Sequence, residues 1–251
     1  MTTAVPDKGT AIVTGASRGI GAAIAKRLAS DGYGVIVNYA ADAAGAESVV
    51  SDITRSGGKA TAMQADVASE SDVAAMFDRA TAQMGPVTVL VNNAGGGGEQ
   101  ARIEEQRAEV LARLMQVNVI GPILCAKHAV RAMSTAHGGT GGSIVTIASI
   151  AAQAPAGADG LVPYEASKGA LVTFARGLSN EVASEGIRSN SVSPGVIATE
   201  LAGPELRDSF GKQTPLGRIG QPEEIASTVS WLVSPEASFV TGSDITVSGG
   251  L

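Results

Sequence analysis

Short apolar runs alternate with longer amphipathic stretches along this chain. Runs such as TAIVTG at residues 10–15 and VTVLVNNAG at 87–95 are rich in β-branched residues and nearly continuously apolar, as expected of strands covered on both faces of a sheet. After the first run, Ile20, Ile24 and Leu28 recur at helical spacing. This alternation predicts an α/β fold, a parallel doubly wound sheet of about seven strands with helices on both faces.

Length and composition fit a single domain over residues 1–251. The chain is 44% hydrophobic and 17% charged, so it can bury a large core without covalent or metal cross-links. A formal net charge of −6 argues against a nucleic-acid or anionic-membrane partner, because such binding needs a basic face. The N-terminus, MTTAVPDKGT, lacks a signal-peptide core, and no apolar run approaches the ~20 residues of a membrane span. We therefore expect a cytoplasmic protein.

Cysteine and histidine are scarce. Cys125 is the only cysteine, so no intrachain disulfide can form and a reducing compartment is the simplest interpretation. It lies in an apolar helical stretch, which is typical of a small core residue. The two histidines, His128 and His137, fit no metal-ligand spacing, so we expect no metal site.

A glycine-rich loop runs from Thr14 to Gly21, between the first predicted strand and the first predicted helix. Glycine there lets the backbone turn tightly and approach a pyrophosphate group, which is stabilised at a helix N-terminus. Such loops also serve simply as helix entries, but the position in the first strand–helix unit favours a dinucleotide. Gly15, Gly19 and Gly21 give the spacing G-x-x-x-G-x-G rather than G-x-G-x-x-G.

This loop resembles that of the classical short-chain dehydrogenase/reductase family, whose members have a Rossmann-type fold and oxidise or reduce CH–OH and carbonyl groups with NAD(P). Further motifs match the family in order and at similar spacing along nearly the whole chain. They are Asp66–Val67, NNAG at 92–95, Asn118 in MQVNVIG, Ser149 in TIASI, Tyr164-x-x-x-Lys168 and SPGVIAT at 193–199.

The resemblance implies a catalytic set, Asn118, Ser149, Tyr164 and Lys168. It also implies that the cofactor is contacted by the glycine loop, the strand ends and the Pro-Gly turn, together with Tyr164 and Lys168. Those further residues are Gly15, Ser17, Arg18, Gly19, Ile20, Gly21, Asn38, Asp66, Val67, Asn92, Ala94, Gly95, Pro194, Gly195, Ile197 and Thr199. Among them, Asp66–Val67 would contact adenine, and the residues after the Pro-Gly turn would hold the nicotinamide amide.

Tyr164 and Lys168 lie one turn apart on a helix that Pro163 can start, so they share a face. A neighbouring ammonium would lower the tyrosine pKa from its usual value near ~10. Alone, the pair is more typical of a solvated helix face, and the accompanying motifs favour catalysis. The resemblance implies that Tyr164 protonates a carbonyl oxygen that Ser149 orients. Lys168 would bind the nicotinamide ribose, and Asn118 would hold a water that relays protons to it.

Two residues favour NADP(H) as the cofactor. Asn38 ends the second predicted strand, where NAD-dependent family members usually carry a carboxylate that binds the ribose 2′-hydroxyl. Arg18 in the glycine loop adds a cation that can pair with a 2′-phosphate, although it also fits a solvated loop residue. Asp42 would reach the ribose if its loop shifted, so NAD(H) stays the alternative.

The substrate is less constrained than the chemistry. Gly95–Gly98 stand where a bulky residue usually follows the family motif, which indicates either a flexible turn or a widened pocket floor. The segment 151–163 is slightly longer than usual, and a substrate lid is expected at about 199–214. The chain resembles 3-oxoacyl-[acyl-carrier-protein] reductases overall. Arg131 fits the docking of an acidic carrier, but Glu185 stands where those enzymes commonly have a basic residue.

We therefore predict an NADPH-dependent reductase that converts a ketone or 3-oxoacyl carbonyl to a secondary alcohol. The alternative enzyme is an NAD-dependent alcohol, sugar or steroid dehydrogenase, and the alternative outside enzymes is a non-catalytic dinucleotide sensor or scaffold. The resemblance also implies a homotetramer, or a homodimer, built from helices near 101–136 and 163–185 and from C-terminal contacts. Small residues such as Gly169, Ala170 and Gly177 permit close packing there, or pack against the sheet.

Overall fold

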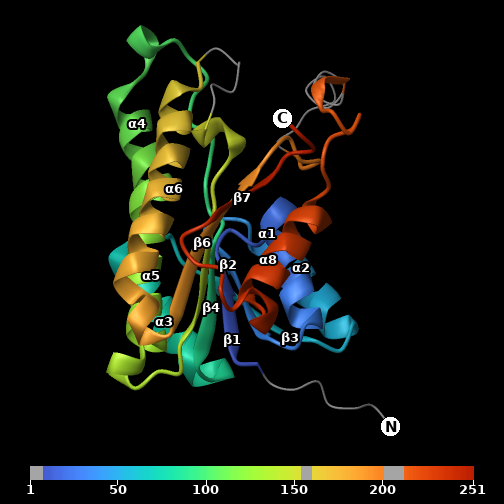
Figure 1. The fold of residues 1–251 in the computed structure, drawn as a ribbon, viewed down its shortest axis with the longest axis vertical. Helices are drawn as coiled ribbons and strands as arrows, with labels where there is room; N and C mark the ends of the chain where they lie inside the picture. Colours follow the sequence, from blue (N-terminus) through green and yellow to red (C-terminus); the bar gives the residue numbers. More distant parts are fainter. Residues whose placement is uncertain (1–7, 154–159, 201–211) are drawn as a thin grey trace.

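A computed structural model describes residues 8–153, 160–200 and 212–251, and its seven strands form one sheet in the order β3-β2-β1-β4-β5-β6-β7 (Figure 1). Every neighbouring pair is parallel. The strands are β1 Thr10–Val13, β2 Gly34–Tyr39, β3 Lys59–Gln64, β4 Val87–Asn92, β5 Gly142–Ile147, β6 Ile187–Pro194 and β7 Asp244–Val247. The strand order switches direction between β1 and β4, which confirms the predicted doubly wound sheet.

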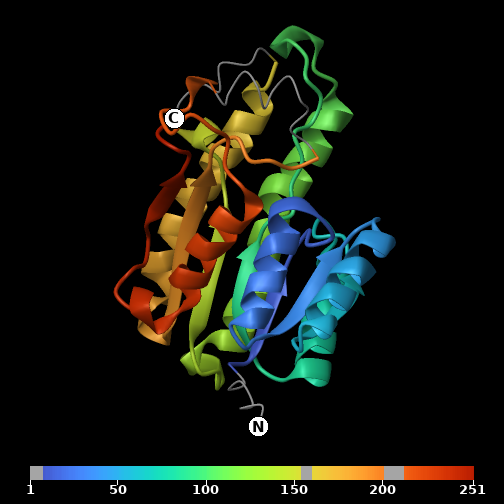
Figure 2. The same ribbon diagram turned by 90° about the vertical axis from the view of Figure 1, so that its right-hand side faces the viewer.

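Helices cover both faces of this sheet, as predicted (Figures 1 and 2). One layer consists of α1 Gly19–Ser30, α2 Ala43–Arg55 and α8 Pro222–Val233. The opposite layer consists of α3 Glu70–Met84, α4 Ala108–Met115, α5 Gly121–Met133 and α6 Val162–Val182. A π-helical segment, Gln116–Ile120, joins α4 to α5 without a break. Proline at the first turn of α6 and of α8 fits helix starts, where the missing N–H costs nothing.

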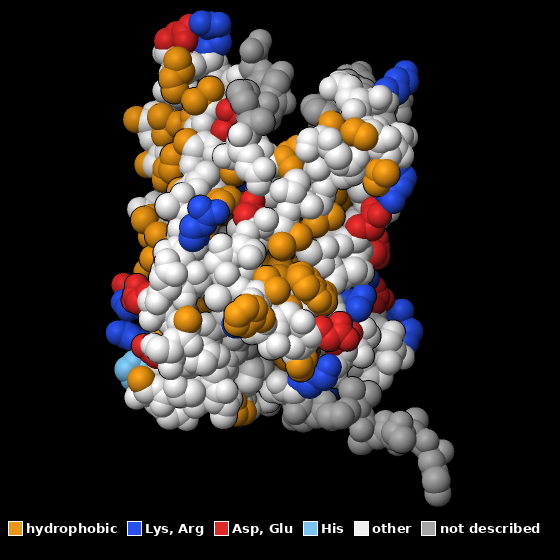
Figure 3. Space-filling view, viewed as in Figure 1, with side chains coloured by type: hydrophobic (Ala, Val, Ile, Leu, Met, Phe, Trp, Pro, Cys, Tyr) orange, Lys and Arg blue, Asp and Glu red, His pale blue; other side chains and the backbone are white. Residues whose placement is uncertain are grey.

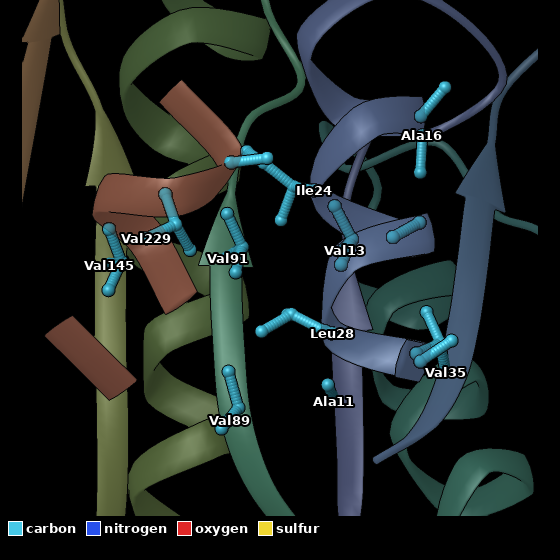
Figure 4. Packing of buried hydrophobic residues seen from close by; sticks show 14 of the residues in the cluster. Ala11, Val13, Ala16, Ile24, Leu28, Val35, Val89, Val91, Val145 and Val229 are labelled. Carbon is cyan, nitrogen blue, oxygen red and sulfur yellow. The ribbon is translucent and has the colours of Figure 1, made fainter. Parts of the chain in front are cut away.

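Alternate strand residues enter two separate cores, because side chains point to opposite faces of a sheet with a period of two. On β1, Ala11 and Val13 pack under α1, α2 and α8, whereas Ile12 packs under α3, α5 and α6. Figure 4 shows Ile24 and Leu28 of α1 packed over the central strands, and neither side chain is exposed at all. Burial on both faces explains why the strands are continuously apolar rather than alternating.

The carboxyl ends of the strands meet at one edge of the sheet, where the loops after β1, β4, β5 and β6 lie together. These loops contain the glycine-rich loop, the NNAG motif, Ser149 and the Pro-Gly turn. The surface is hollowed at this edge, between the free ends of α4 and α6 and the C-terminal part of the chain (Figure 3). The fold thus brings the predicted motifs to one place.

We expect that Leu28→Ala lowers the free energy of unfolding by about 2–5 kcal/mol, because the buried side chain leaves a cavity under β1 and β4. Leu216→Ala is the matched control, since this leucine is 69% exposed and its truncation should cost no more than about 0.5 kcal/mol. Urea unfolding followed by circular dichroism measures both. Equal losses for the two variants would contradict the assigned core.

Candidate active site

The glycine loop has the geometry of a cradle for a phosphate group. Gly15 and Gly19 have φ of +61° and +57°, a region that residues with a side chain rarely adopt. A Cβ on Gly21 would lie 2.5 Å from the Gly15 carbonyl oxygen, so α1 packs against the loop backbone. No side chain caps the N-terminus of α1, which leaves the positive end of the helix dipole facing this edge. The loop therefore fits the pyrophosphate of a dinucleotide.

Thr14 and Asn93 hold this loop against the NNAG motif. Thr14 Oγ1 accepts hydrogen bonds from the backbone N–H groups of Asn93 (2.9 Å) and Ala94 (3.0 Å). In return, Asn93 Nδ2 donates to the carbonyl oxygens of Thr14 (2.9 Å) and Gly15 (3.0 Å). A Cβ on Gly15 would lie 2.9 Å from Ala94 Cα, so the two segments touch. Thr14 and Asn93 were not among the predicted site residues, although Thr14 begins the glycine-rich loop and Asn93 lies in the NNAG motif.

Asn38 does not lie where the sequence prediction placed it. Its side chain is 1% exposed, and Oδ1 accepts from the backbone N–H of Gly15 at 3.2 Å. Its Nδ2 donates to the carbonyl oxygens of Met63 (3.3 Å) and Ala65 (3.0 Å). The amide is therefore buried and its hydrogen bonds are made within the protein. Tyr39, the last residue of β2, is the partly exposed side chain at this strand end.

The charged residues near the loop are already paired. Arg18 is exposed and its NH1 lies 3.5 Å from Glu200 Oε2, just beyond the Pro-Gly turn. Asp42, the alternative ribose contact, accepts from the backbone N–H of Gly45 at 3.0 Å and caps α2. A Cβ on Gly45 would lie 2.9 Å from the Ser17 carbonyl oxygen, so α2 begins against the glycine loop. Arg18 is thus an exposed cation of the glycine loop whose ion pair with Glu200 is long.

Residues after β3 and β4 border the same edge of the sheet. Asp66 Oδ2 pairs with Arg113 at 2.8 Å, and Oδ1 accepts from the backbone N–H of Ala68 at 3.0 Å. Val67 is buried against the start of α5. Asn92 is also buried, and its Nδ2 donates to the Pro122 carbonyl oxygen at 3.2 Å. Its side chain therefore braces β4 against α5 rather than lining the surface.

The Pro-Gly turn extends β6 toward the glycine loop. Pro194 is buried at the end of β6, and the Gly195 N–H donates to the Val247 carbonyl oxygen of β7 at 3.0 Å. Ile197, also buried, pairs with Gly220 through an isolated bridge. A Cβ on Gly19 would lie 3.4 Å from Thr199 Cγ2, so this turn faces the loop, whose Ile20 side chain packs on the core of α1. Most of the predicted lid, residues 201–211, lies outside the described residues.

The structure brings the four predicted catalytic residues together. Ser149 follows β5, and its hydroxyl is close enough to Tyr164, on the first turn of α6, to lower the pKa of that tyrosine. Lys168, one turn further, is 6% exposed, and its Nζ donates to the Ile147 carbonyl oxygen at 3.0 Å. Nζ lies 5.7 Å from the centre of the Tyr164 ring. A Cβ on Gly95 would lie 3.6 Å from Lys168 Nζ and 3.3 Å from Asn118 Oδ1.

Asn118 lies in the π-helical segment between α4 and α5, and its side-chain amide is fully hydrogen-bonded. Oδ1 accepts from the Gly96 N–H and Nδ2 donates to the Gly96 carbonyl oxygen, both at 2.9 Å. The second hydrogen of Nδ2 goes to Ser167 Oγ at 3.0 Å. Ser167 was not identified from the sequence, because a serine within Tyr-x-x-x-Lys carries no signal of its own.

Burial controls the ionisation of this cluster. Burial raises the pKa of Tyr164, while the hydrogen bond with Ser149 acts in the opposite direction. Burial also lowers the pKa of Lys168 to about 8. The expected lowering of the tyrosine pKa by the ammonium is therefore not found, because Nζ points to the Ile147 carbonyl oxygen instead of the phenol. Among the described residues, no group of three or more His, Cys, Asp or Glu side chains can hold a metal ion.

A glycine cradle at the switch point of a parallel sheet, beside a serine–tyrosine–lysine cluster, defines a dinucleotide-dependent oxidoreductase. Residues 15–251 match a family model described as enoyl-(acyl carrier protein) reductase. The uncharacterized oxidoreductase YgfF of Escherichia coli is 44% identical over 96% of this chain and 98% of its own. Glucose 1-dehydrogenase 2 of Bacillus subtilis is 39% identical over 96% and 94%. The 3-oxoacyl-[acyl-carrier-protein] reductase FabG of Staphylococcus aureus is 37% identical over 96% and 97%.

Solved structures agree with these relatives. A short-chain dehydrogenase from Burkholderia cenocepacia in complex with NADP is 34% identical, with a TM-score of 0.88 over 96% of both chains. A 7α-hydroxysteroid dehydrogenase complexed with NADH and 7-oxo glycochenodeoxycholic acid is 35% identical, with a TM-score of 0.90 over 97% of this chain and 94% of that one. The chain belongs to the classical short-chain dehydrogenase/reductase family. It is an oxidoreductase that acts on CH–OH groups with NAD(P).

We expect the stability of the wild type, relative to Lys168→Met, to rise with pH between about 8 and 10.5. In this window the unfolded lysine is protonated and the folded one is largely neutral, so the unfolded chain binds more protons. Thermal unfolding of both proteins across the window gives the difference. Lys59→Met, at the exposed edge strand β3, controls for loss of charge. A difference that does not change with pH for Lys168 would refute the burial of its ammonium.

Proposed function

We propose that this enzyme uses NADPH to reduce a ketone or 3-oxoacyl carbonyl to a secondary alcohol, with Tyr164 as the proton donor. The observation that carries the proposal is the meeting of Ser149, Tyr164 and the buried Lys168, whose Nζ lies 5.7 Å from the centre of the Tyr164 ring. A hydroxyl donor next to a second hydroxyl is the arrangement needed to bind a carbonyl oxygen at two points.

The protein's own residues account for the proton and the orientation of the substrate. When bound, the reduced nicotinamide supplies a hydride to the carbonyl carbon. Ser149 holds the carbonyl oxygen by a hydrogen bond, and Tyr164 gives that oxygen its hydroxyl proton. Lys168, with a pKa lowered to about 8, exchanges protons near neutral pH and can restore the proton to Tyr164. Asn118 holds the Gly96 backbone beside Lys168, and the water relay at Asn118 stays a prediction.

The preference for NADPH now depends on Arg18 alone, since Asn38 is used inside the sheet. The last residue of β2, Tyr39, carries no charge that would repel a 2′-phosphate. Arg18 is exposed, and its guanidinium suits a phosphate oxygen pair better than the single, 3.5 Å contact with Glu200. One structural relative is complexed with NADP and another with NADH, so NAD(H) is the alternative cofactor.

The substrate proposal has two sources of support. The FabG relative is a 3-oxoacyl-[acyl-carrier-protein] reductase, and the steroid dehydrogenase is complexed with a 7-oxo compound, so both names concern a ketone. Glu185, in the 3-10 turn after α6, places an acidic group where a carrier protein would need a basic one. We therefore favour a small ketone or thioester over a carrier-bound acyl group. Glucose 1-dehydrogenase 2 represents the alternative, NAD-dependent oxidation of an alcohol or sugar.

We also propose that the chain forms a homotetramer, or a homodimer, through α5 and α6. The continuous helix Ala108–Met133, which contains α5, is apolar. Among the described residues it is the one helix long and apolar enough to cross a membrane, and by itself this is weak evidence for a span. Ile120 and Ile123 on it are 39% and 38% exposed, so a second copy would cover apolar surface. On α6, a Cβ at Gly177 would meet nothing within 4 Å, which favours packing between copies over packing on the sheet. A cytoplasmic location stays a prediction.

Tyr164→Phe should lower kcat for NADPH-dependent ketone reduction by about 10²–10⁴-fold, because the general acid is lost. NADPH binding, followed by nicotinamide fluorescence, should change little. Tyr33→Phe is the matched control, since this buried tyrosine lies in the core under α1 and far from the site. If Tyr164→Phe kept full activity, the catalytic assignment would be wrong, and the sensor or scaffold hypothesis would gain support.

Arg18→Ala should weaken NADPH binding by about tenfold and leave NADH binding nearly unchanged, because only NADPH carries the 2′-phosphate. Separate fluorescence titrations with the two cofactors give both dissociation constants. Arg55→Ala, another exposed arginine, controls for the loss of one surface charge. Equal changes for the two cofactors would remove the basis for the NADPH preference and favour the NAD-dependent alternative.

A further inference from the structure

Ser167 is a fully buried hydroxyl between two of the residues proposed for catalysis. Its side chain is 0% exposed, and its Oγ donates to the Tyr164 carbonyl oxygen at 2.7 Å. The same Oγ accepts from Asn118 Nδ2 at 3.0 Å. Because the hydroxyl proton is given to Tyr164, the direction of the second bond is settled: Asn118 must be the donor. Ser167 thus connects the first turn of α6 with the π-helical segment.

A second serine on α6 shows which of these bonds is special. Ser179 is 3% exposed, and its Oγ donates to the Arg176 carbonyl oxygen at 2.7 Å, the same backbone contact three residues back. Ser179 lies three turns further along the helix and does not contact Asn118. The backbone contact of Ser167 is therefore an ordinary local feature of a buried helical serine. Its bond from Asn118 is the part that bears on the site.

The connection continues from Asn118 to the glycine run after β4. Asn118 binds both the N–H and the carbonyl oxygen of Gly96 at 2.9 Å. A Cβ on Gly96 or Gly97 would meet nothing within 4 Å, so side-chain packing does not position this part of the loop. The Asn118 amide therefore holds the loop, and Ser167 holds the Asn118 amide. Gly96, Asn118, Ser167 and the Tyr164 carbonyl form one continuous hydrogen-bonded chain.

We propose that Ser167 is a positioning residue, which sets the first turn of α6 relative to Asn118 and so places the Tyr164 hydroxyl opposite Ser149. This inference rests on the proposed function, because it concerns the placement of the proposed proton donor. Ser167 itself does not touch the substrate or the cofactor. It acts through Tyr164 and Asn118.

Removal of the Ser167 hydroxyl should disturb the position of Tyr164 more than the binding of substrate or NADPH. In Ser167→Ala, one hydrogen of Asn118 Nδ2 is left in a buried position with no acceptor, an arrangement that favours a shift of either the amide or the helix turn. Loss of near-attack geometry lowers the rate of the chemical step and leaves the binding of groups elsewhere in the site largely unchanged. Ser179→Ala loses the same kind of backbone contact but leaves the Asn118 amide with its acceptor, so it should not change the rate.

The first test reads the position of Tyr164 without any substrate. The chain has three tyrosines, so phenolate formation at Tyr164 can be measured by ultraviolet difference spectroscopy between each protein and its Tyr164→Phe counterpart. The hydrogen bond with Ser149 lowers the pKa of Tyr164, so Ser167→Ala should raise that pKa by weakening this bond. Ser179→Ala should leave it unchanged. The same shift in both variants, or none in either, overturns the proposal.

The second test is kinetic, with ethyl acetoacetate and NADPH as probes. Ser167→Ala should lower kcat by about tenfold while the KM and the NADPH dissociation constant change by less than about twofold. Ser179→Ala should keep the wild-type kcat. Ser167→Cys, which keeps the size and a weak acceptor, should recover part of the rate, and it carries both tests if the alanine variant does not fold.

The two proposals fail in different ways. If Tyr164→Phe is as active as the wild type, the proposed function is wrong whatever Ser167 does. If Tyr164→Phe is inactive but Ser167→Ala matches Ser179→Ala in the phenolate titration and in kcat, only the positioning role of Ser167 is wrong.

Discussion

The burial of one ammonium group is the constraint on which the rest of the site depends. Lys168 is 6% exposed, and the acceptor found for its Nζ is a backbone carbonyl at the end of β5. Taking a charge out of water is costly unless polar groups surround it, and this cost lowers the pKa of Lys168. Three segments therefore meet at Lys168 Nζ: the end of β5, the first turns of α6 and Gly95. Gly95 meets the requirement because it has no side chain to fill that space.

The fold was predictable because its signal repeats along the chain. The central strands are buried on both faces and the helices carry one apolar side, so the alternation alone indicates a doubly wound parallel sheet. The meeting of Ser149, Tyr164 and Lys168 was predictable for a related reason. Ser149 follows one strand, and Tyr164 and Lys168 share a helix face. Because site residues of a parallel α/β sheet lie beyond the carboxyl ends of its strands, the three are expected to lie together. What the sequence could not supply was the direction in which each side chain points.

Asn38 shows that limit most clearly. Side chains on a strand alternate between faces, so a misjudgement of one residue turns a surface contact into a core contact. Val37 and Tyr39 belong to the core under α1 and α2, while Ile36 lies on the opposite side. Asn38 follows Ile36 to that side, where its amide joins the glycine loop to the end of β3. Pairs between distant segments, such as Arg113 with Asp66, leave no local pattern either.

The glycine run after β4 has a consequence for how this enzyme can change. Gly96 and Gly97 do not have a positive φ, unlike Gly98, and the space beside their Cα atoms is open. Asn118 holds Gly96 through its backbone alone. A Cβ at either position can therefore be added without a clash and without removing the bonds from Asn118. The loop thus separates a backbone that Asn118 holds from side-chain positions that are free to vary.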